Sequence, residues 1–224
     1  MSSSAHSSAP ASPSETSTGR RTTVLAARPL SAFRTVDLVT AAMVGVAFGV
    51  VFWAWSLVYA ATSGPVGALV APLTSILAGP WLLAGVVAGL LVRRPGAALM
   101  AEVVAASVSA LIGSEWGWTT VVSGVLQGLG VEIALALFAW RRFGPAVAML
   151  AGSLAATLEV VGYEWWTFYA GFDLRFKLVY LAFFVLSGAV AAGLGGWAIV
   201  RALARLGAVN AMPPGQEELE RSLR

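Results

Sequence analysis

The chain has 224 residues, of which 58% are hydrophobic and only 11% are charged, and its net charge is +3. A soluble globular domain carries about 25% charged residues, so the composition excludes a soluble protein and predicts an all-α integral membrane protein. Cysteine is absent and the single histidine is His6, which excludes disulfides, thiolate catalysis and an intramembrane zinc site built on histidines. The positive charge comes from arginines at segment ends, so it indicates membrane orientation and not nucleic-acid binding.

Three regions follow from the distribution of polar residues. Residues 1–34 are rich in Ser, Ala, Thr and Pro, which predicts a disordered cytoplasmic tail. Residues 35–208 are predicted to form one transmembrane domain, and residues 209–224 a short cytoplasmic tail. No metal or cofactor is expected.

Long apolar runs in the central region predict six transmembrane helices. The first is expected to end at Gly64-Pro65, because Gly and Pro break helices. The second contains Pro72 and Gly79-Pro80, and it is either one kinked helix or a short piece followed by a span. The six segments run over about residues 37–60, 66–92, 97–112, 119–140, 145–169 and 174–206.

Charge asymmetry predicts the orientation of these six helices. With both termini on one side, all Lys and Arg residues except Arg175 and Lys177 fall on the side of the termini. The positive-inside rule then places both termini in the cytoplasm of a multi-pass cell-membrane protein. The residues on that side are Arg20, Arg21, Arg28, Arg34, Arg93, Arg94, Arg141, Arg142, Arg201, Arg205, Arg221 and Arg224.

Carboxylates and aromatic residues alternate at two places on the predicted outer side. One is the turn Gly113–Trp118, and the other is the cluster Tyr163–Tyr169. Aromatic faces attract cations by about 0.5–2 kcal/mol and stack on flat rings. We therefore predict that the two clusters face each other and bind a small cationic or amine-bearing ligand. Trp116, Trp118, Tyr163 and Trp166 are the candidate aromatic contacts, although an aromatic belt at the membrane interface is the alternative explanation.

Acidic residues exceed basic ones inside the spans. A charge at mid-membrane costs at least about 2.5–3.5 kcal/mol, and no Lys or Arg lies deep in a span to offset it. This surplus favours a ligand that carries positive charge or amino groups. Glu115 and Glu164 are assigned a ligand role, while Glu132 and Glu159 either bind ligand or tie helices together. Glu102 is expected to be structural.

Spacing on two segments indicates a pocket between them. Thr120, Ser123 and Gln127 share one face of the fourth segment, and Gln127 offers both a donor and an acceptor. Ser153, Thr157 and Glu164 share a face of the fifth. Two polar stripes of this kind predict that the ligand lies between these helices.

Several functions are excluded or disfavoured. The chain has no P-loop, since its single lysine is Lys177, and no nucleophile lies beside a base. An enzyme is therefore not expected. A binding subunit that relies on partner chains is favoured, and a self-sufficient proton-coupled carrier that uses Glu132 and Glu159 is the alternative.

Three motifs in order resemble the YkoE family. They are Arg93–Leu99 with Glu102, the turn Gly113–Gly117, and Leu126–Glu132. That family comprises substrate-binding S components of energy-coupling factor (ECF) transporters for hydroxymethylpyrimidine and thiamine. The resemblance spans about residues 35–208.

The resemblance implies a six-helix S-component bundle that captures a vitamin from outside. Transport would then require a transmembrane coupling subunit and two ATPase subunits on separate chains. The resemblance implies ligand roles for Glu115, Trp116, Gln127 and Glu132. The small residues Ala41, Gly45 and Gly49 are similar to the small-xxx-small face through which S components contact the coupling subunit.

Overall fold

A computed structural model describes residues 33–223, and in this part of the chain all regular structure is helical. The predicted tail of residues 1–34 lies almost wholly outside the described residues. The helices are α1 Thr35–Leu69, the 3-10 helices η1 Ala71–Leu77 and η2 Gly79–Leu82, α2 Leu83–Val92, α3 Ala97–Ile112, α4 Thr119–Leu137, α5 Pro145–Glu159, the π-helical turn η3 Val160–Glu164, α6 Trp165–Thr167, α7 Leu174–Ser187, the π-helical segment η4 Gly188–Leu194, α8 Gly195–Arg205 and α9 Pro213–Ser222.

Four helical stretches of the described chain are long and apolar enough to cross a membrane, and a bent pair makes a fifth. The four are Thr35–Leu69, Thr119–Leu137, Pro145–Thr167 and Leu174–Arg205. The remaining predicted helix, the third in chain order, is α3, which has 16 residues and so spans only about 24 Å. The described chain therefore has four or five candidate spans, and the count of six stays a prediction.

The bent pair resolves the ambiguity of the second predicted segment. Residues 71–77 and 79–92 are separate pieces whose axes differ by 41°. Irregular backbone is tolerated at membrane depth only where protein satisfies its polar groups. Here Ser187 does so, because its hydroxyl accepts from the Gly79 amide at 3.0 Å and donates to the Ile76 carbonyl at 2.5 Å. The Ser75 hydroxyl donates to the Tyr180 carbonyl at 2.8 Å, so α7 holds the break in place.

The first helix is longer than its sequence predicts. The expected end at Gly64-Pro65 is wrong, since α1 continues through Pro65 to Leu69. Proline removes one backbone hydrogen bond and crowds the preceding turn, but membrane helices tolerate it. The Trp55 indole also donates to the Leu77 carbonyl at 2.8 Å, which ties the far half of α1 to η1.

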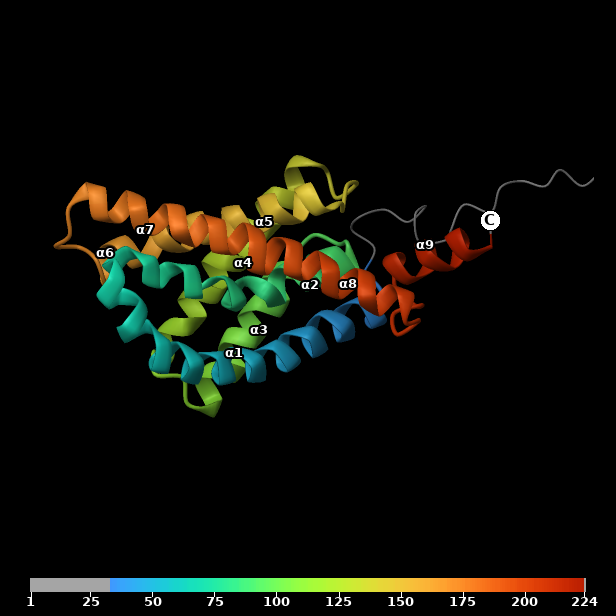
Figure 1. Ribbon diagram of the computed structural model, residues 1–224. Helices are drawn as coiled ribbons and strands as arrows, with labels where there is room; N and C mark the ends of the chain where they lie inside the picture. The colour runs from blue at the N-terminus through green and yellow to red at the C-terminus, as the bar shows by residue number, and fades with distance from the viewer. Residues whose placement is uncertain (1–32, 224) are drawn as a thin grey trace, which may run out of the picture.

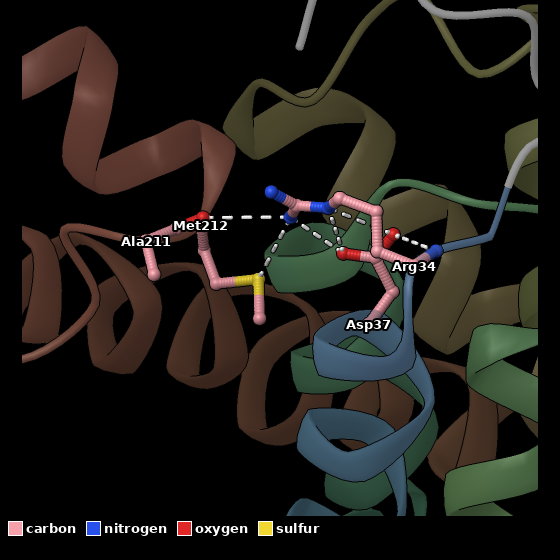
Figure 2. A network of polar contacts seen from close by, with 4 residues as sticks. All are labelled: Arg34, Asp37, Ala211 and Met212. Atoms are coloured by element: carbon pink, nitrogen blue, oxygen red, sulfur yellow. Dashed lines mark hydrogen bonds and ion pairs between the residues drawn. The ribbon is translucent and has the colours of Figure 1, made fainter.

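Figure 1 shows α1 and α7 as long outer helices on opposite sides of the view, with α2, α3 and α4 between them. The start of α1 lies beside the segment before α9, and α6 lies at the opposite end of the bundle. A polar network joins the start of α1 to the segment before α9, as Figure 2 shows. Arg34 pairs with Asp37 at 2.6 Å and donates to the Ala211 carbonyl at 3.4 Å. The predicted polar tail thus contains a helix docked on the transmembrane region. We call this the termini end.

The small-residue face of α1 packs inside the chain. Ala41 is 2% exposed, and Gly45 and Gly49 are buried against α3. A Cβ atom added at Gly45 would lie 2.7 Å from the Ala101 carbonyl oxygen. Small residues at this spacing allow two helices to approach closely. The prediction that these three residues contact a coupling subunit is therefore corrected, because α3 of the same chain covers them.

We predict that Gly45→Ala destabilises the fold, because its methyl group would collide with α3 backbone. Overpacking of this kind costs about 1–3 kcal/mol. Gly64→Ala is the matched control, since nothing lies within 4 Å of a Cβ atom there and Ala is favoured over Gly in a helix. Thermal unfolding in detergent should show a lower midpoint for Gly45→Ala alone. Equal midpoints for the two variants would contradict this packing.

Candidate functional site

A cavity of about 240 Å³ opens at the end of the bundle opposite the termini. Its walls come from α1, the η1–η2 break, α3, α4, the end of α5 and α7. It therefore lies between segments that are far apart in the sequence. Its lining residues are Phe52, Tyr59, Ala78, Trp81, Ala106, Ser109, Ser114, Trp116, Thr119, Thr120, Ser123, Gln127, Glu159, Tyr163, Glu164, Phe168, Tyr169, Tyr180 and Phe184.

Three aromatic rings form one wall of this cavity. The Trp81 and Trp116 ring centroids are 5.1 Å apart with an interplanar angle of 87°, and Tyr59 lies 5.2 Å from Trp81 and 5.7 Å from Trp116. Edge-to-face pairs of this kind are each worth about 0.5–1.5 kcal/mol beyond the area they bury. The Trp81 indole also donates to the Phe52 carbonyl at 3.2 Å. These contacts hold the three rings together as one wall.

A π-helical turn brings two glutamates to the cavity together. In a regular α-helix, residues five apart point about 140° away from each other. The turn Val160–Glu164 follows directly after Glu159, and π-helical hydrogen bonds join residues five apart. This change of register places Glu159 and Glu164 in the same cavity wall, with Tyr163 beside them.

These two carboxylates have hydrogen-bonding capacity that the protein does not use. Among the described residues, the buried Oε2 atoms of Glu159 and Glu164 have no hydrogen-bond partner. Neither Lys nor Arg lines the cavity. A buried polar atom without a partner costs about 1–3 kcal/mol, so both oxygens are available to a donor supplied by a ligand.

Gln127 reaches the cavity from α4 and is fixed from behind. Its side-chain amide lies 3.3 Å from Glu102 Oε1 and 3.1 Å from the Trp81 carbonyl oxygen. Both neighbours accept hydrogen bonds, so the amide is assigned with its nitrogen toward them. Glu102 is fully buried and its Oε2 accepts from the Gly85 amide. Gln127 is therefore oriented by Glu102 and by the carbonyl of a cavity residue.

The remaining intramembrane glutamates accept from helix N-termini. Glu102 accepts from the amide of Gly85, which lies in the first turn of α2, where amides have no partner within the helix. Glu132 does the same for α3, since its Oε1 accepts from the Ala98 and Leu99 amides at 2.8 and 3.4 Å. The helix dipole stabilises a negative charge there. Glu132, expected from sequence to bind ligand, lies outside the cavity lining and joins α4 to α3.

The structure brings four of the eight predicted ligand residues together and leaves four outside. Trp116, Gln127, Tyr163 and Glu164 line the cavity, while Glu132, Glu115, Trp118 and Trp166 do not. Trp118 is 65% exposed and Trp166 is 68% exposed. The Trp166 indole donates to the Val161 carbonyl at 2.8 Å, and Lys177 Nζ lies 5.5 Å from its ring centroid.

Sequence reasoning did not assign several residues of the cavity lining to the site. Trp81 and Tyr59 were given no ligand role, and Glu159 was left open between structure and ligand. Trp81 follows Gly79-Pro80, and this break in the apolar run was the available signal that its segment turns inside the protein. The register shift that turns Glu164 toward Glu159 has no comparable signal in the sequence.

Comparisons with known proteins agree with this architecture. Residues 36–158 match a family model described as "ABC-type cobalt transport system, permease component". The chain is 30% identical over 191 residues to the "Putative HMP/thiamine permease protein YkoE" of Bacillus subtilis (strain 168), covering 84% of this chain and 93% of that protein. It is 29% identical to a solved S component of an ECF transporter, with a TM-score of 0.79, over 86% of this chain and 96% of that one.

The cavity offers two carboxylates without imidazole or thiolate. Among residues 33–223, no group of three or more His, Cys, Asp or Glu side chains is placed to hold a metal ion. Sequence identity over most of both chains and the shared fold agree with each other. The chain belongs to the YkoE-type S components of ECF transporters, which are non-enzymatic binding subunits in the membrane.

Proposed function

We propose that the cavity captures thiamine or its hydroxymethylpyrimidine precursor for an ATP-driven importer. The observation that carries this proposal is the pair Glu159 and Glu164, each with a buried Oε2 that lacks a partner among the described residues, in a cavity without Lys or Arg. An anionic substrate would be repelled there. A ligand with an amino group or a positive charge supplies the missing donor or the missing charge.

The shape and chemistry of the walls support a flat heterocycle. The rings of Tyr59, Trp81 and Trp116 offer faces and edges to an aromatic ligand. An aminopyrimidine carries a donor beside an acceptor, which a carboxylate or the amide of Gln127 can match. Thiamine adds a cationic ring, for which aromatic faces are favourable. The name of the Bacillus relative gives the same two ligands.

Partner chains follow from the same proposal. The sequence contains no P-loop, so ATP hydrolysis must come from separate subunits. We propose that a transmembrane coupling subunit and two ATPase subunits complete the importer. Because α3 covers the small-residue face of α1, the coupling subunit would dock on other parts of the chain.

We also propose that the cavity faces the outside of the cell. Twelve of the 14 Lys and Arg residues belong to the termini side in the six-helix topology, and the cavity lies at the other end. The positive-inside rule supports cytoplasmic termini. A ligand would then reach the aromatic wall directly from outside.

Neutralising a cavity carboxylate should weaken binding. We expect Glu164→Gln to raise the Kd for thiamine at least about tenfold, because a hydrogen bond to a charged group is worth about 1.5–3 kcal/mol. Glu115→Gln is the matched control, since Glu115 is exposed outside the cavity. Calorimetry on the purified chain measures both. Full-affinity binding by Glu164→Gln would remove the carboxylate from the site.

The two neighbouring tryptophans of the α3–α4 turn should behave differently. Trp116→Ala removes one ring of the aromatic wall and should weaken ligand binding about tenfold, whereas Trp118→Ala should leave the Kd unchanged because Trp118 is 65% exposed. Quenching of the remaining tryptophan fluorescence by ligand gives both constants. A larger loss from Trp118→Ala would contradict the position of the site.

The absence of cysteine allows a direct test of orientation. Ala170→Cys places a thiol at the cavity end, and Ala208→Cys places one near the termini; both positions are exposed. A membrane-impermeant maleimide should label Ala170→Cys in intact cells and Ala208→Cys only after permeabilisation. The reverse pattern would show that the cavity faces the cytoplasm.

A further inference from the structure

A second cavity lies at the termini end, on the far side of the bundle from the ligand cavity. It has a volume of about 870 Å³ and lies between the end of α2, the α4–α5 connection, α8 and α9. None of its lining residues lines the ligand cavity. The proposed vitamin binding therefore gives this second cavity no role.

Its lining is strongly basic. Five arginines and two glutamates contribute to it, so it carries a formal charge of +3. The glutamates are already engaged, because Glu217 pairs with Arg93 and Glu218 pairs with Arg221 at 2.5 Å. Among the described residues, Arg141 and Arg201 have no acidic partner. Two guanidinium groups thus remain for an anion.

The same cavity has an aromatic and apolar wall. Trp140, Phe143 and Trp197 line it together with Val200. The Arg201 guanidinium carbon lies 5.4 Å from the Trp197 ring centroid. Arginine over an aromatic ring keeps its edge available for bidentate hydrogen bonds to phosphate oxygens. The lining is therefore amphipathic, with cations beside a surface that suits hydrocarbon.

The backbone around this cavity adopts an uncommon conformation. Within residues 33–223, three residues other than glycine have a positive φ angle, namely Arg93 at 58°, Ala139 at 50° and Trp140 at 50°. All three line this cavity. Left-handed backbone at such residues is disfavoured and occurs often at ligand sites. Uncommon backbone of this kind, which follows the ends of α2 and α4, is therefore concentrated around this cavity.

We propose that this cavity binds the phosphate headgroup of an anionic phospholipid, with Arg141 and Arg201 as its principal ligands. The group that the arginines recognise is a phosphate or phosphodiester, and it belongs to a membrane lipid. Basic cavities between helices near one membrane surface bind anionic headgroups. The apolar part of the lining, with Trp197 and Val200 of α8, would contact the acyl chains beside the headgroup.

Native mass spectrometry of the full chain tests this lipid site. The chain is purified in detergent and mixed with phosphatidylglycerol or phosphatidylcholine, as wild type, as the double variant Arg141→Gln/Arg201→Gln and as Arg175→Gln. Arg175 is exposed at the opposite end, so its variant controls for loss of one positive charge. Wild type and Arg175→Gln should bind phosphatidylglycerol at least about tenfold more tightly than phosphatidylcholine. The double variant should lose this preference while keeping its melting temperature.

Two results would overturn the proposal. One is an unchanged preference for phosphatidylglycerol in the double variant, which would place the lipid elsewhere. The other is displacement of phosphatidylglycerol by glycerol phosphate or inorganic phosphate at concentrations equal to the lipid's, which would identify a site for a soluble anion. If the double variant melts earlier, the single variants Arg141→Gln and Arg201→Gln replace it, and each must lower the preference severalfold.

Discussion

Buried carboxylates without cationic partners are the constraint on which this bundle depends. Each must find hydrogen-bond donors inside the membrane or remain unsatisfied at a cost. Glu102 and Glu132 find theirs at the first turns of α2 and α3, where helix amides have no other partner. They join neighbouring helices by this means. In the described structure the buried Oε2 atoms of Glu132, Glu159 and Glu164 have no partner. Only Glu159 and Glu164 line the ligand cavity.

Departures from regular α-helix create that cavity. The break between η1 and η2 carries Trp81 into the interior, and Ser187 satisfies the backbone groups it frees. The π-helical turn after Glu159 rotates Glu164 into the same wall. Both features lie at one end of the molecule, whereas positive charge gathers at the other. The two ends of the bundle thus differ in charge, because the ligand cavity contains glutamates without Lys or Arg and the cavity at the termini end has an excess of arginine.

The sequence predicts the helices better than it predicts the site. Apolar length identifies the membrane segments, and α3 and the start of α4 match their predicted limits. Trp116, Tyr163 and Glu164, which line the cavity, are singled out by the alternation of carboxylates and aromatic residues, and Gln127 is singled out by helical spacing. The predicted ligand roles of Trp118 and Trp166 rest on regular geometry, which the turn and the π-helical register do not follow. The small residues Ala41, Gly45 and Gly49 correctly indicate close helix packing, but spacing alone does not say which helix packs there.

The central claim is that cavity carboxylates recognise an amino group on a pyrimidine ring. Calorimetric titration of the purified chain with two ligands tests this directly, using hydroxymethylpyrimidine and its analogue with hydrogen in place of the amino group. A site built around a ligand donor rejects an analogue that lacks it, because its own acceptors stay unpaired. We expect the analogue to bind at least about a hundredfold more weakly. Equal affinity for the two ligands would contradict the assignment of Glu159 and Glu164 to ligand recognition.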